Sequence, residues 1–386
     1  METLSWLEII GLAARQLLPV WIALVVTFAV SIRFKRRLGL YGKLFDSNVG
    51  MIGFAIVMFW LFTAFFADFI ITHDPLGQVS RMRNVSPGTP LPRPDDMYAY
   101  YLLGGDSLAR DVFSRMVMGA REVLRIAPFA AMISFMIGIS LGLPAGYFSG
   151  RLDTLLTFLA NLVLAFPVIL LFFLLVAPEI QDTLIPVSMA GVLFLVPILF
   201  VTVLLNSRFF TQPSKRNLYV GVVLALGAWA YIGLVFDLDP TGLWSMSPNL
   251  LNVFVAVVFV NAPTVFRIVR GITLDIKTRD YVAAAQTRGE GPWYIMLWEI
   301  LPNARGPLIV DFCLRIGYTT ILLGTLGFFG LGVSPESPDW GSTINAGRRL
   351  LSVYPTPALV PALSLMSLVL GLNLLADGLR EESLKD

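Results

Sequence analysis

Apolar residues lie in long runs along this chain, and short polar segments separate the runs. A helix that crosses the hydrocarbon core of a bilayer, about 30 Å thick, needs about 20 apolar residues, because lipid cannot satisfy exposed backbone groups. Runs of this kind are found at residues 12–32, 49–72, 126–148, 154–177, 183–205, 218–236, 250–266, 309–331 and 357–376. The pattern predicts an all-α fold, a polytopic transmembrane helical bundle of about nine spans. With an odd number of spans, the two termini lie on opposite sides of the membrane.

The first apolar run is expected to be a retained span and not a signal peptide. A signal peptide carries positive charge before its apolar stretch and a small-residue cleavage site after it. Here Glu2 and Glu8 precede the run, and the basic segment 33–37 follows it.

The positions of Lys and Arg in the short loops predict the orientation of the spans. Basic residues follow the first, fifth and seventh runs, whereas the loops around Glu179 and Asp237 contain none. This places the N-terminus outside and the C-terminus in the cytoplasm. Residues 73–125 form a long extracytoplasmic loop that carries seven Arg, but it carries six acidic residues too, and long loops contribute little to the rule.

Composition agrees with a membrane protein and excludes several kinds of site. Of the 386 residues, 56% are hydrophobic and 14% are charged, whereas soluble domains carry about a quarter charged residues. A net charge of +2 gives no argument for binding nucleic acid. Cys313 has no second cysteine for an intrachain disulfide, and the single histidine, His73, cannot by itself build a metal site.

The chain contains no constellation that would bind ATP or catalyse a reaction. Residues 39–44 hint at a phosphate-binding loop, but that pattern requires a glycine at position 37 and a Ser or Thr at position 44, where Arg and Leu stand. We therefore expect no enzyme and no bound cofactor here, and any ATP would have to be hydrolysed by a partner. An ion-coupled secondary transporter is one possible class of function, but the scarcity of charges in the central runs argues against it.

Two patterns indicate ordinary helix packing. Gly138, Gly142, Gly146 and Gly150 recur every four residues, so they line one helix face and allow a close helix approach. Prolines in the apolar runs, Pro167 among them, are interpreted as ordinary features of membrane helices.

Residues 279–302 predict a helical hairpin on the cytoplasmic face. Thr278 or Asp280 can cap a helix that contains three alanines and ends at Gly289. Pro292 then begins a second short helix, 292–301, which Pro302 closes. The small alanine surface would dock easily into a groove of a partner. On the residues alone, an ordinary interfacial loop is an equal alternative.

This hairpin resembles the EAA loop of ABC-transporter permeases: Glu-Ala-Ala, three residues, Gly, nine residues, a hydrophobic residue, any residue, then Leu-Pro. Ala283 stands where the pattern has Glu, and Glu299 where it has the later hydrophobic residue, so an ion pair from the first Glu to an ATPase cannot form. The residues that match the pattern are Ala284, Ala285, Gly289, Leu301 and Pro302.

Further segments resemble the C-type permeases of oligopeptide, dipeptide and nickel importers. Residues 104–121 follow the signature Gly-Thr-Asp-x-x-Gly-Arg-Asp-x-x-Ser-Arg and then Gly-Ala-Arg, except at Gly105 and Ala109. The matching residues are Asp106, Arg110, Asp111, Ser114, Arg115, Gly119 and Arg121. The other segments are residues 145–148 with Asp153, residues 165–167, residues 330–332 with Trp340 and Gly341, and residues 377–380.

The resemblance implies a six-span permease core. Its first part would be residues 45–176 and its second part 250–386, with residues 1–44 as an extra N-terminal span and basic linker, and 177–249 as an inserted transmembrane hairpin. The function implied is that of the permease subunit of an ATP-driven, binding-protein-dependent importer, of oligopeptides or dipeptides, in the bacterial inner membrane. The implied partners are a second homologous permease, two ATPase subunits that bind residues 283–285, 289 and 301–302, and an extracytoplasmic substrate-binding protein.

Overall fold

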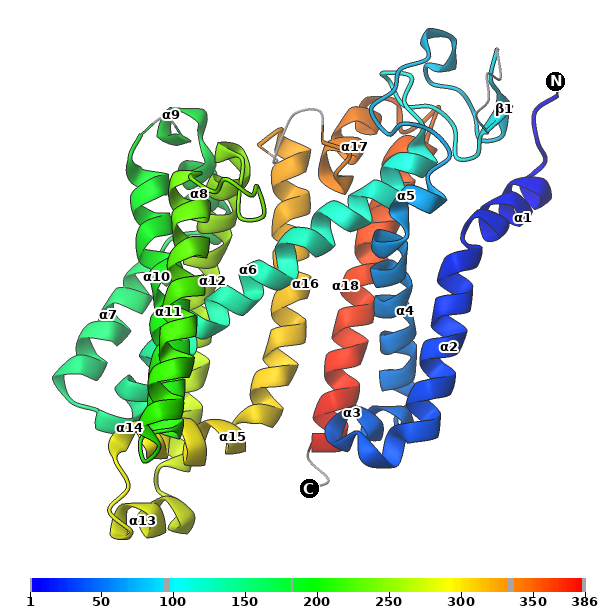
Figure 1. Cartoon of the computed structure of the whole chain (residues 1–386). Helices are drawn as coiled ribbons and strands as arrows, with labels where there is room; N and C mark the ends of the chain where they lie inside the picture. The colour runs from blue at the N-terminus through cyan, green and yellow to red at the C-terminus, as the bar shows by residue number, and fades with distance from the viewer. Residues whose placement is uncertain (1, 93–97, 182, 332–336, 384–386) are drawn as a thin grey trace. The chain divides into compact units, whose positions relative to one another are not determined.

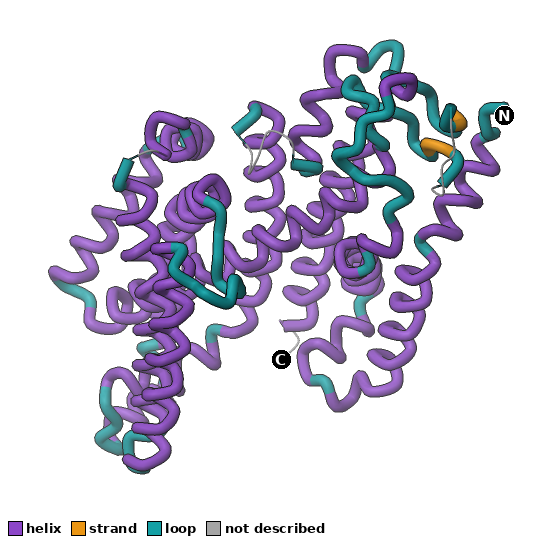
Figure 2. Tube along the Cα trace, turned by 45° about the horizontal axis from the view of Figure 1, so that its top comes forward, coloured by secondary structure: helices purple, strands orange, loops and turns teal. Residues whose placement is uncertain are grey.

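The computed structural model describes residues 2–92, 98–181, 183–331 and 337–383. Helices dominate this part of the chain, and its strands are one short antiparallel pair, β1 (Thr89–Pro90) and β2 (Tyr100–Tyr101) (Figures 1 and 2). Among the described residues, 8 helices are long and apolar enough to cross a membrane, and a bent pair of helices raises the number to 9. The prediction of an all-α, polytopic bundle is confirmed.

The chain divides into two compact units, which are described separately. Unit 1 comprises residues 1–128 and 313–386, and unit 2 comprises residues 129–312. Two long helices, α6 (Val112–Phe148) and α16 (Arg305–Phe329), contribute residues to both units.

Unit 1 is built around the antiparallel pair α4 and α18. The helices of this unit besides α6 and α16 are α1 (Trp6–Gln16), α2 (Leu18–Phe34), α3 (Gly39–Lys43), α4 (Asn48–Phe65), α5 (Ala67–Ile70), α17 (Trp340–Gly347) and α18 (Thr356–Ser383). Short 3₁₀ turns lie at Lys35–Arg37, Leu44–Asp46, Ser80–Met82 and Arg348–Leu350.

Glycines bring α4 and α18 into backbone contact. A Cβ on Gly53 would overlap the backbone of Leu375, and the backbones of Gly50 and Gly378 touch. Further along, the indole nitrogen of Trp60 donates a hydrogen bond to Ser367 Oγ at 2.8 Å. Small residues at such crossings are what membrane helices use, because lipid supplies no hydrophobic force between helices.

The N-terminal residues and the C-terminal helix lie at opposite ends of unit 1. At one end, Leu4 N donates to Gly88 O at 3.0 Å and Gln16 Nε2 donates to Ile70 O at 2.9 Å. At the other end, Ser47 Oγ donates to Glu381 Oε2 at 3.2 Å. The predicted span 12–32 is shifted: α1 ends at Gln16 and the apolar span is Leu18–Arg37, because the polar pair Arg15 and Gln16 falls outside it.

Unit 2 contains the central spans and the predicted cytoplasmic hairpin. Its further helices are α7 (Arg151–Ala165), α8 (Val168–Val176), α9 (Pro178–Gln181), α10 (Ile185–Arg208), α11 (Pro213–Phe236), α12 (Pro248–Ile276), α13 (Asp280–Thr287), α14 (Pro292–Tyr294) and α15 (Leu301–Asn303), with a π-helical segment at Ile295–Ile300.

The glycine row of α6 packs against α12, as its spacing predicts. A Cβ on Gly142 would lie 2.8 Å from Val269 Cβ and 3.0 Å from Phe266 O, and Gly146 meets Thr273 in the same way. Gly150 does not belong to this face. It follows the end of α6 with a φ of +75°, and its missing Cβ faces open space.

The apolar run at residues 154–177 folds as two helices, α7 and α8, which meet at a bend of 85°. The interpretation of Pro167 as an ordinary feature of a membrane helix is therefore wrong. The break lies at Pro167, which has no N–H for the helical ladder and forces the preceding residue out of the helical region. Phe166 accordingly adopts an extended conformation, with φ −76° and ψ 140°.

The bent pair nonetheless crosses unit 2 from end to end. α7 begins where Asp153 pairs with Arg270, near the end of α12 that leads into α13. α9 contacts the helices α10 and α12, and α10 then runs 24 residues, about 36 Å, back to the level of α13 and α14 (Figure 1). Counted as one broken span, α7 and α8 bring the number of candidate spans in the described residues to 9.

Hydropathy also misplaced the ends of two helices. The loop predicted at residues 73–125 ends at residue 111, because α6 begins at Val112 and runs for 37 residues. The run at 250–266 likewise extends to Ile276. Charged side chains such as Arg115, Arg121 and Arg270 end an apolar run without ending a helix.

We expect Gly142→Leu to destabilise unit 2, because the added side chain would overlap Val269 and the α12 backbone. Overpacking of this kind costs about 1–3 kcal/mol. The matched control is Gly221→Leu on α11, where a Cβ meets no atom within 4 Å. The thermal unfolding midpoint of the purified protein should fall for Gly142→Leu and stay near the parent value for Gly221→Leu. Equal midpoints for both variants would contradict the packing described for α6 and α12.

Candidate functional site

The hairpin of residues 279–302 is a compact helix–turn–helix, which we call the coupling hairpin after the role that the resemblance to the EAA loop implies. α13 ends in a Schellman turn: Gly289 N donates to Gln286 O at 2.9 Å and Glu290 N donates to Ala285 O at 3.2 Å. Gly289 has a φ of +78°, a conformation that costs other residues about 1–2 kcal/mol. The predicted glycine stop is thus present. The helix start differs, because Arg279 is the N-cap and makes no side-chain capping bond.

The second helix of the coupling hairpin is longer than predicted. Pro292 occupies its first turn as expected, but Pro302 does not close it, since the helix continues through α15 to Asn303. Proline clashes with the carbonyl four residues before it. The π-helical segment Ile295–Ile300 precedes Pro302 directly, and its wider turn accommodates the ring.

One face of the coupling hairpin is buried against α12. Val282, Ala285 and Ile300 are all 0% exposed and share a core with Val269 and Ile276 of that helix. The surface alanines are therefore Ala283 and Ala284, whereas Ala285, which the EAA resemblance assigned to ATPase binding, is buried. Leu301 packs partly against the same core, and Pro302 is exposed.

An ion pair between its two helices braces the coupling hairpin. Arg288 Nη2 lies 2.9 Å from Glu299 Oε1, an exposed pair worth at most about 1 kcal/mol. Glu299 stands where the EAA pattern has a hydrophobic residue. The carboxylate at this position therefore has an ion-pair partner, Arg288, at the end of α13. The spacing along the sequence did not predict this pair.

The segment that contains Tyr147 and Asp153 ties the ends of α6 and α7 to the coupling hairpin. Gln286 Nε2 donates to the Tyr147 hydroxyl at 3.3 Å, and Lys277 Nζ donates to Gly146 O at 2.8 Å. Asp153 forms a two-pronged ion pair with Arg270 of α12. A motif more than a hundred residues away in the sequence is thus brought to the base of the hairpin.

In unit 1, the residues of the 104–121 motif form a buried polar network. Asp106 accepts hydrogen bonds from the backbone of Leu108 and from both the backbone and the side chain of Arg110, the last at 2.7 Å. Asp111 accepts from Ser114 Oγ at 2.6 Å and from Thr72 Oγ1 at 2.9 Å. All of these carboxylates are fully buried, so their hydrogen bonds fix the loop instead of offering a binding surface.

Arg115 joins this motif to the segment around Trp340. Its guanidinium is 0% exposed and donates to Ser337 O at 3.0 Å and to Thr343 Oγ1 at 3.1 Å. Trp340 in turn donates from its indole nitrogen to Met116 O at 2.9 Å. Two motifs more than 200 residues apart therefore form one cluster. Gly332, a third motif position, lies outside the described residues.

Burial shifts the pKa of two titrating groups in the same cluster, Tyr101 and Asp339. Burial raises the pKa of Tyr101 above its usual range, and the nearby carboxylates of Asp111 and Asp106 raise it further. Burial likewise raises the pKa of Asp339, although the backbone N–H of Ser342 stabilises its charged form with a hydrogen bond of 2.8 Å.

The two departures from the 104–121 signature have structural consequences. Ala109 stands where the signature has glycine and adopts a φ of +62°, the left-handed region that glycine enters without penalty. Gly105 stands where the signature has threonine, and a Cβ there would overlap the carbonyl oxygen of Met82. The segment before the motif therefore lies closer to it than a threonine would allow.

A contact that the sequence did not indicate joins the α10–α11 hairpin to the coupling hairpin. Trp298 donates from its indole nitrogen to Ser207 Oγ at 3.0 Å, and the guanidinium of Arg208 lies 4.7 Å from the centre of the Trp298 ring. Phe200, Val203 and other α10 side chains pack on the same core as the hairpin.

Comparison with known proteins gives a consistent set of relatives. The family model described as binding-protein-dependent transport system inner membrane component matches residues 138–381. The glutathione transport system permease protein GsiD of Pectobacterium atrosepticum is 30% identical over 279 residues, 72% of this chain and 70% of that protein. The dipeptide transport system permease protein DppC of Alkalihalophilus pseudofirmus is 27% identical over 341 residues, 88% and 87% of the two chains. The di/tripeptide transport system permease protein DppC of Pseudomonas aeruginosa is 29% identical over 338 residues, 87% and 88%.

The close contact between Gly105 and Met82 predicts that threonine, the signature residue at position 105, would destabilise this chain. We expect Gly105→Thr to destabilise unit 1 by about 1–3 kcal/mol, because the side chain must displace the Met82 carbonyl. Leu108→Thr, at a side chain that is 48% exposed in the same loop, serves as the control. Protease resistance and thermal unfolding should both fall for Gly105→Thr alone. Full stability of that variant would show that the loop adapts freely.

Proposed function

We propose a function for this chain from the premise that it belongs to the family of binding-protein-dependent transport system inner membrane components, the permeases of ABC importers. Such a chain is a multi-pass membrane transport subunit, and ATP hydrolysis takes place in separate subunits. The alternative of an ion-coupled secondary transporter is wrong for a member of this family. The cargo we propose is a short peptide, since the relatives are named for glutathione, dipeptides and di/tripeptides.

The proposed assembly contains this chain, a second homologous permease, two ATPase subunits and an extracytoplasmic substrate-binding protein. ATP and Mg²⁺ belong to the ATPase subunits in this proposal, and this chain holds neither. An ATPase subunit binds the exposed face of α13, which presents Ala283, Ala284 and Gly289. The coupling hairpin then lies in the cytoplasm with the C-terminus, and the N-terminus lies outside. The basic loops and the opposite positions of the two chain ends in unit 1 support this orientation.

The observation that carries the proposal is the firm connection between the coupling hairpin and two long helices. Its buried face shares a core with α12, and Gln286 binds Tyr147 at the end of α6. Lys277, at the end of α12, also binds that end of α6. Because α6 and α12 are packed through the glycine row, a force on α13 moves them together. When ATP binding closes the ATPase subunits, the hairpin acts as a rigid lever on both helices.

A bulky charge on the docking face should uncouple transport. We expect Ala284→Arg to reduce peptide uptake and retention of the ATPase subunits at least tenfold, a change of about 1.4 kcal/mol or more in docking free energy. Ala284→Ser, which stays small, should retain both activities. Uptake of a labelled dipeptide is measured in proteoliposomes with the binding protein, and retention by copurification.

The control for the added charge is Asn48→Arg, at an exposed position of unit 1 outside the coupling hairpin. It should insert and transport as the parent does. Normal uptake and normal ATPase retention by Ala284→Arg would show that α13 is not the docking face.

The orientation predicts opposite compartments for the two ends of the chain. A reporter fused before Met1 should be extracytoplasmic, and one fused after Asp386 should be cytoplasmic, because the proposal counts nine spans between them, with the bent pair α7–α8 as one of the nine. Paired alkaline phosphatase and fluorescent protein fusions measure this directly, with a fusion at residue 290 as the cytoplasmic reference. If both ends report the same compartment, the bent pair α7–α8 or the first span does not cross the membrane.

A further inference from the structure

One face of α1 packs against unit 1 and binds the long loop that follows α5. Ile9 is buried, and a Cβ on Gly88 of that loop would lie 3.0 Å from its side chain. Leu4 N donates a hydrogen bond to Gly88 O at 3.0 Å, and Gln16 Nε2 donates to Ile70 O at 2.9 Å. α1 is therefore fixed both to the loop and to the end of α5.

The remaining surface of α1 is divided into an apolar stripe and a polar stripe. At 3.6 residues per turn, Trp6, Leu7 and Ile10 fall within one arc of about 100°. These three side chains are 63%, 84% and 65% exposed. Glu8 and Arg15 lie together on the neighbouring arc and are exposed as well. α1 is therefore amphipathic on the surface that it does not use for packing.

The apolar stripe of α1 continues into the surface of a membrane span. Leu17 is the C-cap of α1 and the N-cap of α2, so no loop separates the two helices. The candidate span Leu18–Arg37 begins with α2 and exposes apolar side chains such as Ile22 and Val25. Figure 1 shows α1 leaving the axis of α2 at the upper end of that helix in the view. Since the apolar span starts at the edge of the hydrocarbon core, α1 lies beside that edge.

The side chains of the two stripes fit the two sides of this boundary. Tryptophan is enriched where hydrocarbon meets water, and the apolar face of an amphipathic helix enters the lipid by about 5–10 Å. Glu8 and Arg15 remain in water in this arrangement. Because they carry opposite charges, the polar stripe offers no net attraction to anionic lipids, and the apolar stripe accounts for the interaction.

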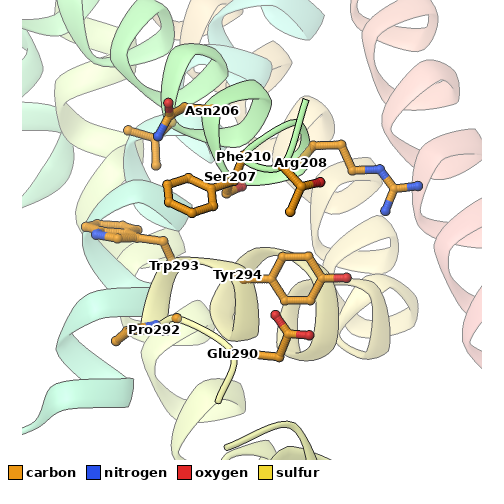
Figure 3. Close-up of a pocket in the computed structure, with 11 residues that line it drawn as sticks. Asn206, Ser207, Arg208, Phe210, Glu290, Pro292, Trp293 and Tyr294 are labelled. Carbon is orange, nitrogen blue, oxygen red and sulfur yellow. The ribbon is translucent and has the colours of Figure 1, made fainter. Parts of the chain in front are cut away.

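Another surface with exposed aromatic residues lacks this separation of charge and apolar area. Phe210 and Trp293 line a cavity of about 560 Å³ between the end of α10 and residues 290–294 (Figure 3). Arg208 and Glu290 both line that cavity too, so its charges select no single kind of occupant. On α1, in contrast, polar and apolar side chains occupy different stripes, and the chain continues directly into a membrane span.

We propose that α1 lies along the membrane surface on the side of the N-terminus, with Trp6, Leu7 and Ile10 inserted among the phospholipids. Because its opposite face binds Ile70 and Gly88, α1 then holds the loop of residues 71–111 at the bilayer. Residues 1–44 lie outside the six-span core that the resemblance implies, so this lipid contact is an addition to that core. The inference requires only that α2 spans the membrane, and it does not depend on the proposed cargo or partner subunits.

Depth-dependent fluorescence quenching tests the position of α1. In a Cys313→Ala background, Ile10→Cys and Arg15→Cys are each labelled with the environment-sensitive dye NBD, and the full chain is placed in phosphatidylcholine nanodiscs. A spin label on the acyl chain close to the headgroup should quench the Ile10→Cys probe several-fold more than the Arg15→Cys probe. Iodide in the aqueous phase should show the opposite preference.

Three results would overturn the inference. Stronger quenching of the Ile10→Cys probe by a spin label at the end of the acyl chain would make α1 part of a spanning helix. Equal quenching of both probes by iodide would show that the apolar stripe does not enter lipid and is left for a protein partner. Lipid quenching that appears only with phosphatidylglycerol in the nanodisc would show that charge, and not the apolar stripe, causes the interaction.

A charge on the apolar stripe should remove α1 from the lipid. With the probe at Leu7→Cys, Ile10→Glu should reduce quenching by the shallow spin label several-fold, whereas Ile10→Met, which stays apolar, should leave it near the parent value. Since Ile10 is exposed, neither variant should lower the thermal unfolding midpoint, and a loss of quenching then reports the position of α1 and not unfolding. Unchanged quenching in Ile10→Glu would show that this side chain does not enter the lipid.

Discussion

Backbone-close packing of helices through glycine is the interaction on which both units depend. A lipid bilayer provides no hydrophobic force between apolar helices, so contact area and close approach must hold them together. In unit 2, Gly142 and Gly146 let α6 contact α12 over several turns. In unit 1, Gly50 and Gly53 do the same for α4 against α18. Side chains at these positions would separate the helices and remove the contacts that position the functional segments.

The coupling hairpin depends on that packing for its rigidity. Its core is continuous with α12, and Gln286 donates a hydrogen bond to Tyr147 of α6. Lys277, at the end of α12, binds the same end of α6. In the proposed function the hairpin is a lever, and a lever transmits force only if its base does not yield; the base here is formed by two helices that pack closely against each other. The contact of Trp298 with Ser207 and Arg208 adds a third support from α10.

The buried network of unit 1 has a different physical basis. Carboxylates such as Asp106 and Asp111 are costly to bury, and each is accommodated because several donors surround it. The same network brings Arg115 to Thr343 of helix α17. The two positions that depart from the motif keep the backbone of the loop in different ways. Ala109 adopts a left-handed conformation although it is not glycine. Gly105 has no side chain, which allows its close contact with the backbone of Met82.

The sequence by itself determined the class of fold, a polytopic helical bundle, and the positions of the main motifs. Apolar runs depend only on neighbouring residues in the sequence. The same holds for the end of α13 at Gly289 and for the start of α14 at Pro292. The tertiary structure decided which way the side chains face: Ala285 is buried while Ala283 and Ala284 are exposed, although the three are neighbours in the sequence. It also decided the partners of Arg288, Arg115 and Trp298 and the bend at Pro167. Those features depend on residues tens or hundreds of positions away, or on how neighbouring helices accept a break, and no local pattern encodes such distances.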